Sequence, residues 1–247
     1  MNEENINNKI FELLGENPDR LAIIEENIPI KVQMEYFDYA NLIRKENNYD
    51  NILKDKKLLF LNDTSLISKK EILSKLACLA LPEAYRTIEK YLQLPDKKLI
   101  NWAKLALFES KMLLESSLLD QNHVLISSGL GGKNNMLRYF IVVYLKNEFS
   151  FDATKKKVVV NEFDSVLKKN NCETELLKFY NKYFTLTALI PLNVNLKHTF
   201  SDAINECNEY GNFLVDSFIV TNVKKLTISE INSLFDKLNN NVNEQSC

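Results

Sequence analysis

The chain is poor in the residues that usually mark turns and metal sites. Its 247 residues include five glycines, five prolines and two histidines. Few glycines leave few places where the backbone adopts a positive φ cheaply or lies close to a partner. The four cysteines show no paired spacing, and with two histidines as imidazole partners we expect no metal site. We therefore expect reduced thiols in a reducing compartment.

Excess charge of one sign and long apolar runs are missing as well. The formal net charge is −2, which gives no overall attraction to nucleic acid or anionic lipid, so phosphate binding would need a local patch. The polar, acidic start of the chain lacks the basic and then apolar pattern of a secretory signal. The apolar run from Tyr139 to Leu145 is too short to span a bilayer. We expect a cytoplasmic protein with no membrane partner.

Helical spacing dominates the first 120 residues. Val32, Tyr36, either Tyr39 or Ala40, and Ile43 recur at the spacing of one helix face, which predicts a helix of about four turns. No strand is expected in this part. Further short or medium helices are predicted over Ile10–Leu14, Leu21–Glu26, Ile72–Leu79, Ala84–Leu92 and Leu99–Leu107.

Two of these helices carry a recognisable pattern. Pro82-Glu-Ala opens one helix and Ile88-Glu-Lys-Tyr-Leu closes it, before Pro95-Asp-Lys-Lys-Leu-Ile-Asn-Trp-Ala-Lys-Leu-Ala-Leu107. This stretch resembles HEAT-type repeats of the short bacterial variety, over residues 68–117. Such repeats are stacked helix pairs that commonly serve as binding surfaces, so the resemblance implies interaction rather than catalysis. About one and a half repeats are recognisable, whereas a free-standing solenoid needs about three. Either the upstream helices are degenerate repeats or the following domain caps the stack.

From His123 onward the pattern changes to β-branched and aromatic runs separated by helical segments. We predict the order β-β-α-α-β-α-β-α, a small mixed sheet with helices on one face. The expected strands are Val124–Ser127, Leu137–Leu145, Phe184–Leu192 and Phe213–Val220. The expected helices are Val159–Leu167, capped by Asp152 or Thr154, then Leu176–Tyr180, Leu196–Tyr210 and Ile228–Leu238. The predicted fold class is α+β: a helical HEAT-like region over 1–120, a mixed domain over 121–238 and a polar tail over 239–247.

The glycines gather at one place. Gly129, Gly131 and Gly132 fall within four residues, between the first two expected strands. We interpret Val124–Leu145 as an antiparallel hairpin whose Gly-Gly-Lys-Asn-Asn connection tolerates left-handed backbone. A rival interpretation has one strand, a phosphate-cradling loop and a buried helix from Asn134 to Lys146.

This glycine segment matches no phosphate loop fully. Asn134 stands where a phosphate loop has Ser or Thr after the lysine, and where the dinucleotide fingerprint has its third glycine. The Gly129 to Gly132 spacing is that of RNA-binding KH loops, but the flanking helices are not evident. Three interpretations stay open: a bulged structural hairpin, a binding site for protein, RNA or an anionic ligand, and a catalytic site. The candidate binding residues are Gly129, Gly131, Gly132, Lys133, Asn134 and Arg138. Arg138 could equally pair with Glu109 or Glu115.

Catalytic signatures are otherwise lacking. His123 and His198 belong to no recognisable triad, and the sequence contains no Gly-x-Ser-x-Gly elbow. Lys155–Lys157 and Lys168–Lys169 predict a solvated helix face, with weak RNA contact as a minor alternative. The sequence favours a non-enzymatic cytoplasmic interaction module without a cofactor, which binds a protein or ribonucleoprotein partner near the glycine-rich hairpin. The alternatives are a nucleotide- or phosphoryl-binding enzyme that uses the Gly129–Lys133 loop, and an RNA-binding protein.

Overall fold

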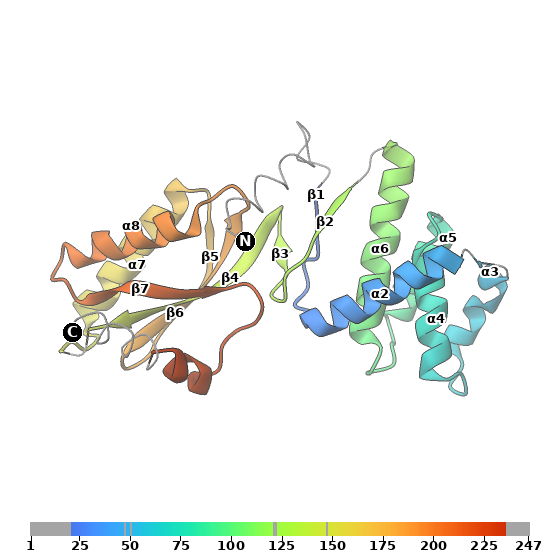
Figure 1. Cartoon of the computed structure of the whole chain (residues 1–247), viewed down its shortest axis with the longest axis horizontal. Helices are drawn as coiled ribbons and strands as arrows, with labels where there is room; N and C mark the ends of the chain where they lie inside the picture. Colours follow the sequence, from blue (N-terminus) through green and yellow to red (C-terminus); the bar gives the residue numbers. More distant parts are fainter. Residues whose placement is uncertain (1–20, 47, 50, 121–122, 147, 236–247) are drawn as a thin grey trace. The chain divides into compact units, whose positions relative to one another are not determined.

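The chain has an α+β fold, helical in its N-terminal part and built on an antiparallel sheet in its C-terminal part (Figure 1). The computed structural model describes residues 21–46, 48–49, 51–120, 123–146 and 148–235. The chain divides into two compact units, residues 1–127 and residues 128–247, where the sequence predicts a boundary at 120. The predicted helix at Ile10–Leu14 and the polar tail at 239–247 lie outside the described residues. Among the described helices, none combines the length and apolar character needed to cross a bilayer.

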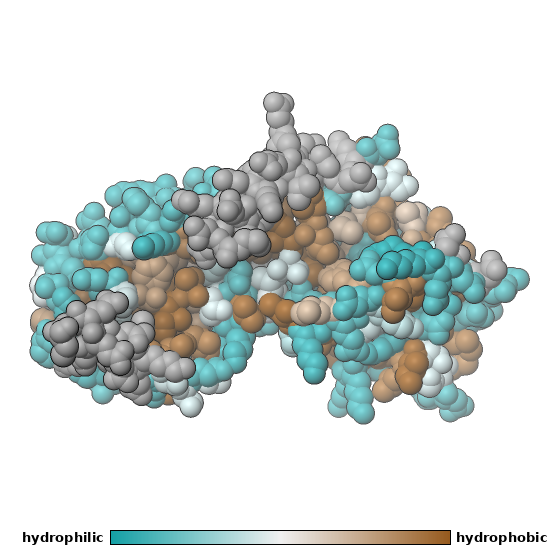
Figure 2. Space-filling model, in the orientation of Figure 1, coloured by the Kyte–Doolittle hydropathy of each residue, from teal (hydrophilic) through white to brown (hydrophobic). Residues whose placement is uncertain are grey.

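Unit 1 is a group of helices around one apolar core. Helix α2 (Ile30–Glu46) buries Tyr36, Ala40 and Ile43, which confirms the predicted face. The outer surface of α2 is mostly hydrophilic in Figure 2. The helices predicted over Ile72–Leu79, Ala84–Leu92 and Leu99–Leu107 are present as α4 (Leu66–Ala77), α5 (Pro82–Tyr91) and α6 (Ile100–Leu119). Two short helices that the sequence does not predict precede them, α3 (Ile52–Asp55) and the 3-10 helix η2 (Lys56–Phe60).

A short parallel strand pair joins the two ends of unit 1. Strand β1 (Leu21–Ile23) pairs in register with β2 (Val124–Ile126). The prediction of a helix over Leu21–Glu26, and of no strand before residue 120, is therefore wrong. The error has a physical cause: the pairing partner of β1 lies about a hundred residues downstream, so local periodicity carries no trace of it.

Unit 2 is built on an antiparallel sheet with β4 (Met136–Leu145) at its centre. On one side β4 pairs with β6 (Tyr183–Pro191), which pairs with β5 (Glu173–Phe179). On the other side β4 pairs with β7 (Leu214–Thr221) and, at its N-terminal end, with the two-residue strand β3 (Gly132–Lys133). Helix α7 (Ala153–Lys169) connects β4 to β5, and α8 (Leu196–Asn208) connects β6 to β7. The sequence β4-α7-β5-β6-α8-β7 with spatial order β5-β6-β4-β7 is the ferredoxin-like arrangement.

The two faces of the sheet are covered differently. Ile141 and Val143 of β4 pack with Phe163 of α7 and Phe200 of α8. The alternate residues of β4, Phe140 and Val142 among them, face the opposite side and pack with Ile231. Ile231 belongs to the helical residues 228–235. The prediction that all helices share one face is therefore wrong, because this last helix covers the face that α7 and α8 leave open.

Two further expectations for unit 2 need correction. Residues 124–126 pair with β1 and not with β4, so the predicted hairpin between Val124–Ser127 and Leu137–Leu145 is wrong, and β3 takes that place. The predicted helix over Leu176–Tyr180 is also wrong, because Glu173–Phe179 is strand β5. The rival helix from Asn134 to Lys146 is excluded by β4. Strands β6 and β7 and helices α7 and α8 are confirmed.

Candidate functional site

The glycine-rich segment folds as a tight hairpin between β3 and β4. Gly132 pairs with Leu137 and Lys133 with Met136, so the connection consists of two asparagines. Asn134 and Asn135 have positive φ values of 51° and 60°. A type I′ turn, which is common in two-residue hairpins, requires positive φ at both of its central residues. Their short polar side chains tolerate this backbone better than most. Local chemistry therefore explains the turn.

The glycines before this turn serve close packing. A Cβ on Gly129 would stand 1.7 Å from the carbonyl oxygen of Val223. The next residue, Leu130, is buried and donates its N–H to Asn222 O at 3.0 Å. Gly131 has a φ of 72°, and its carbonyl accepts from Ser128 Oγ at 3.0 Å. Gly129 is thus required by the close approach of Val223, and the positive φ of Gly131 favours glycine at that position.

Arg138 of β4 holds this loop in place through its side-chain hydrogen bonds. Its Nε and Nη2 donate to the two carboxylate oxygens of Glu175 at 2.5 and 2.7 Å, and its Nη1 donates to Leu130 O at 2.8 Å. These hydrogen bonds hold the pKa of the Glu175 carboxyl below its ordinary value. The expected alternative, a pair with Glu109 or Glu115, is wrong, because Glu175 of β5 supplies the carboxylate.

The six predicted binding residues therefore lie together in the β3–β4 hairpin and the segment before it, but their exposure to solvent differs. Gly129, Gly131 and Gly132 are buried and Arg138 is engaged. Lys133 and Asn134 are exposed at the tip. Lys133 is consequently the part of the predicted site that can reach a partner.

A second group of side chains lies at the opposite end of β4. There β5 and β6 meet in a tight turn, in which Tyr180 N donates to Tyr183 O at 2.8 Å across exposed Asn181 and Lys182. The first turn of α7 is at the same end, because it follows the end of β4 after a short loop. We call this group the lysine–aromatic end, and it consists of Phe149, Lys155, Lys156, Lys178, Phe179, Tyr180 and Lys182.

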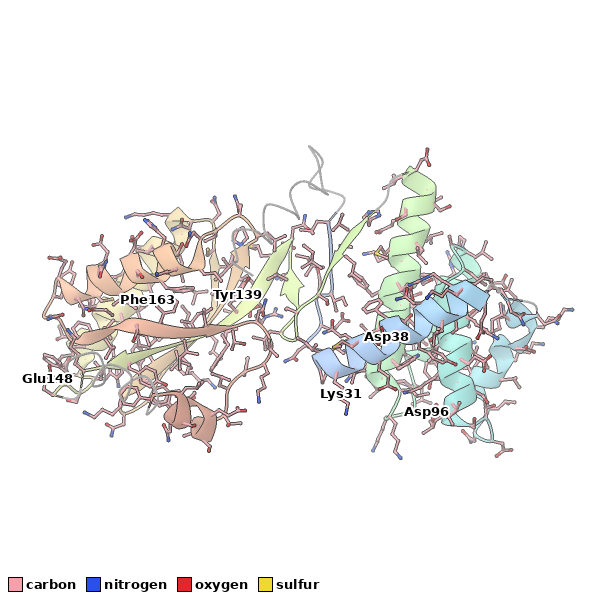
Figure 3. The ribbon with its side chains drawn as sticks, viewed as in Figure 1. Lys31, Asp38, Asp96, Tyr139, Glu148 and Phe163 are labelled. Carbon is pink, nitrogen blue, oxygen red and sulfur yellow. The ribbon has the colours of Figure 1, made fainter. Side chains whose placement is uncertain are left out.

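Two lysines of α7 lie beside rings on the face of the sheet that α7 covers. Lys155 Nζ lies 5.7 Å from the centroid of the Phe149 ring, and Lys156 Nζ lies 5.8 Å from the centroid of the Phe179 ring. Lys182 Nζ donates to Phe149 O at 3.1 Å. Figure 3 places Glu148 at this same end, just before Phe149 in the chain. Distances near 6 Å are those of cation–π contacts, which hold the ammonium groups close to the rings.

A row of rings crosses from the lysine–aromatic end to the last helix. Tyr180 stacks on Tyr183, with centroids 4.7 Å apart and 20° between the planes. Tyr183 contacts Tyr144 at 5.8 Å, and Tyr144 stacks on Phe235 at 4.2 Å and 25°. Tyr144 and Tyr183 are buried, whereas 38% of Tyr180 is exposed. The row therefore ends in one aromatic residue that a ligand can reach.

Sequence periodicity misses most of this end. The basic run of α7 draws attention to Lys155 and Lys156, but a helix predicted over Leu176–Tyr180 hides Lys178, Tyr180 and Lys182. Leu176, Lys178 and Tyr180 recur at every second residue, which is the period of a strand face. That alternation is the signal that could have found them.

A buried charged cluster of unit 1 is centred on Glu109. Glu109 of α6 is 1% exposed, accepts from Tyr36 OH at 2.5 Å and pairs with Arg44. Burial, followed by the Glu109 charge, raises the pKa of Tyr36 well above its ordinary value, so Tyr36 remains a donor. The same two causes raise the pKa of the Cys78 thiol to about 11, which leaves it protonated and unreactive at neutral pH. Glu109 therefore bonds both Tyr36 and Arg44.

The two histidines also occupy structural positions. His123 Nδ1 is 2.7 Å from Ser116 Oγ, and that hydroxyl donates its proton to Met112 O at 2.8 Å. Ser116 therefore has an acceptor on its own helix in addition to the imidazole. His198 Nδ1 is 2.8 Å from Asp202 on the surface of α8. Within the described ranges, no three His, Cys, Asp or Glu side chains gather in a way that could hold a metal ion.

Comparison with known proteins gives little further information. No family model matches the chain, and no curated protein matches it. One solved structure, described as a REP-associated tyrosine transposase bound to a REP hairpin, aligns with 37% of this chain and 59% of its own chain. The aligned residues are 11% identical and the TM-score is 0.33. A similarity of this degree shows neither a shared family nor a shared activity.

Proposed function

We propose that the chain is a non-enzymatic interaction module and that unit 2 carries its partner surface. The observation that carries the proposal is Tyr180, which is 38% exposed, with Lys178 two residues before it on β5 and Lys182 in the turn after it. Exposed aromatic side chains flanked by cations favour recognition of a partner, because rings bury a large area at low entropic cost. The exposed tip of the β3–β4 hairpin, with Lys133 and Asn134, is a second contact in the proposal.

Unit 1 serves in this proposal as a helical scaffold. Helices α4, α5 and α6 contact one another within a single core, in keeping with stacked helix pairs. The resemblance to HEAT-type repeats stays a prediction. The proposed location is the cytoplasm, which agrees with the free thiols of Cys78, Cys172 and Cys207.

The alternative of a phosphoryl-binding enzyme loses its structural basis. It needs a helix whose N-terminus faces the phosphate directly after the glycine loop. Strand β4 occupies that part of the chain from Met136 to Leu145. Leu130 N also donates to Asn222 O and Arg138 is bound to Glu175, while the backbone of Val223 lies against Gly129 and leaves no space there.

Site-specific photo-crosslinking in living cells of the native host tests the proposal, because it captures a bound partner of any identity. The photoreactive residue p-benzoylphenylalanine replaces Tyr180 in one strain and Lys133 in a second. Tyr210, exposed after α8, is the matched control position. We expect discrete adducts from positions 180 and 133 and none from 210. Equal adduct patterns at all three positions, or none at any, would contradict the proposal.

A further inference from the structure

We infer that the lysine–aromatic end binds single-stranded nucleic acid, with Tyr180 as the stacking residue. The inference rests on the proposed function and names its partner class. Its first support is the ring row, because Tyr180 is the exposed end of a row in which Tyr183 and Tyr144 follow in order. A base that lies on Tyr180 would extend the stacked pair that Tyr180 forms with Tyr183. Base–aromatic stacking is the main attractive contact of proteins that bind single strands without sequence preference.

The second support is the position of the charges. Lys178 precedes Tyr180 by two residues on the same face of β5, and Lys182 follows it in the turn. Phosphates lie on both sides of a stacked base in a single strand, so these two cations, one before the ring and one after it, suit this ligand. Lys155 and Lys156 lie at the same end of the sheet but on its opposite face, beside Phe149 and Phe179. Lys155 is also paired with Asp152 at 2.5 Å, and Lys182 Nζ donates to Phe149 O at 3.1 Å.

The geometry favours a single strand over a duplex. Tyr180 stands directly before a two-residue turn, where its exposed ring can meet the face of one separate base. In a duplex the base faces are covered by their neighbours, and proteins then read the backbone and the groove edges. An acidic protein segment would satisfy the lysines but would gain no comparable stacking on the ring.

The test uses the full chain and fluorescein-labelled oligouridylate of about 12 nucleotides, a length within the range bound by compact single-strand sites. Binding is followed by fluorescence anisotropy. We expect Tyr180→Ala to weaken binding about tenfold or more, because one stacking contact is lost. Tyr180→Phe keeps the ring and should bind within about twofold of the parent chain. Tyr210→Ala is the matched control, since it removes an exposed tyrosine elsewhere.

Salt and competitors complete the experiment. If Lys178 and Lys182 contact phosphates, log K should fall with log salt at a slope of roughly −1.4, and Lys178→Ala with Lys182→Ala should make this slope shallower. Duplex RNA of equal length and poly-aspartate should compete poorly. The inference is overturned if Tyr180→Ala binds like Tyr210→Ala, or if poly-aspartate competes as well as the oligonucleotide. Adducts at position 180 that consist of protein would then leave the proposed function standing.

Discussion

At the scale of single residues, Lys133 of β3 and Arg138 of β4 belong to the same hairpin but have different roles. We predict that Arg138→Ala lowers the free energy of unfolding by about 1–3 kcal/mol, because it removes charge-assisted hydrogen bonds to Glu175 and Leu130. Lys133→Ala should change it by less than about 0.5 kcal/mol, because the side chain is exposed. Urea unfolding of both variants measures the difference. Equal losses would show that Lys133 also supports the loop.

The Arg138–Glu175 pair also makes stability depend on pH. The Arg138 hydrogen bonds, above all, lower the pKa of Glu175 in the folded chain. A carboxyl with a lowered folded pKa stabilises the fold above its unfolded pKa of about 4.3, and this stabilisation is lost as the pH falls through the folded value. We expect the difference in unfolding free energy between the parent chain and Glu175→Gln to shrink from pH 6 towards pH 3. A difference that stays constant over this range would contradict the assignment.

At the scale of elements, the last helix begins with a reciprocal cap. Thr227 N donates to Glu230 Oε2 at 2.9 Å, and Glu230 N donates to Thr227 Oγ1 at 3.3 Å. We predict that Thr227→Ala lowers the free energy of unfolding by about 1 kcal/mol. The exposed Ser229→Ala is the control and should have little effect. If Thr227→Ala leaves the free energy of unfolding in urea unchanged, the segment is held without the cap by contacts such as the 2.9 Å hydrogen bond from Tyr144 OH to Ile231 O.

Sequence periodicity predicts the elements that bury one regular face and misses those defined by distant pairing. Helix α2 is found because its buried residues recur every three or four positions. Strand β5 is missed because Leu176, Leu177 and Tyr180 also fit a helix, and because the ladder is irregular between Thr174 and Leu176. The same error hides the lysine–aromatic end, whereas the tip of the predicted site, Lys133, lies in a turn whose asparagines are a local signal.

At the scale of the whole molecule, the distribution of buried side chains sets the expected unfolding behaviour. Each of the three apolar clusters among the described residues draws its members from one unit: one from unit 1 and two from unit 2. Trp102, the single tryptophan of the chain, belongs to the cluster of unit 1. Its fluorescence therefore reports on unit 1, while circular dichroism reports on both units.

We predict that Leu186→Ala, in the core of unit 2, lowers the stability of that unit by about 2–5 kcal/mol without moving the Trp102 transition. Leu186 is fully buried in β6, so the variant leaves a cavity between the sheet and its helices. The converse variant is Leu73→Ala in α4, which should move the fluorescence transition by a comparable amount. Urea titrations read by fluorescence and by circular dichroism measure both. If Leu186→Ala shifts the two signals together, the units unfold as one cooperative body, and energetic coupling between them must be added to the contacts within each.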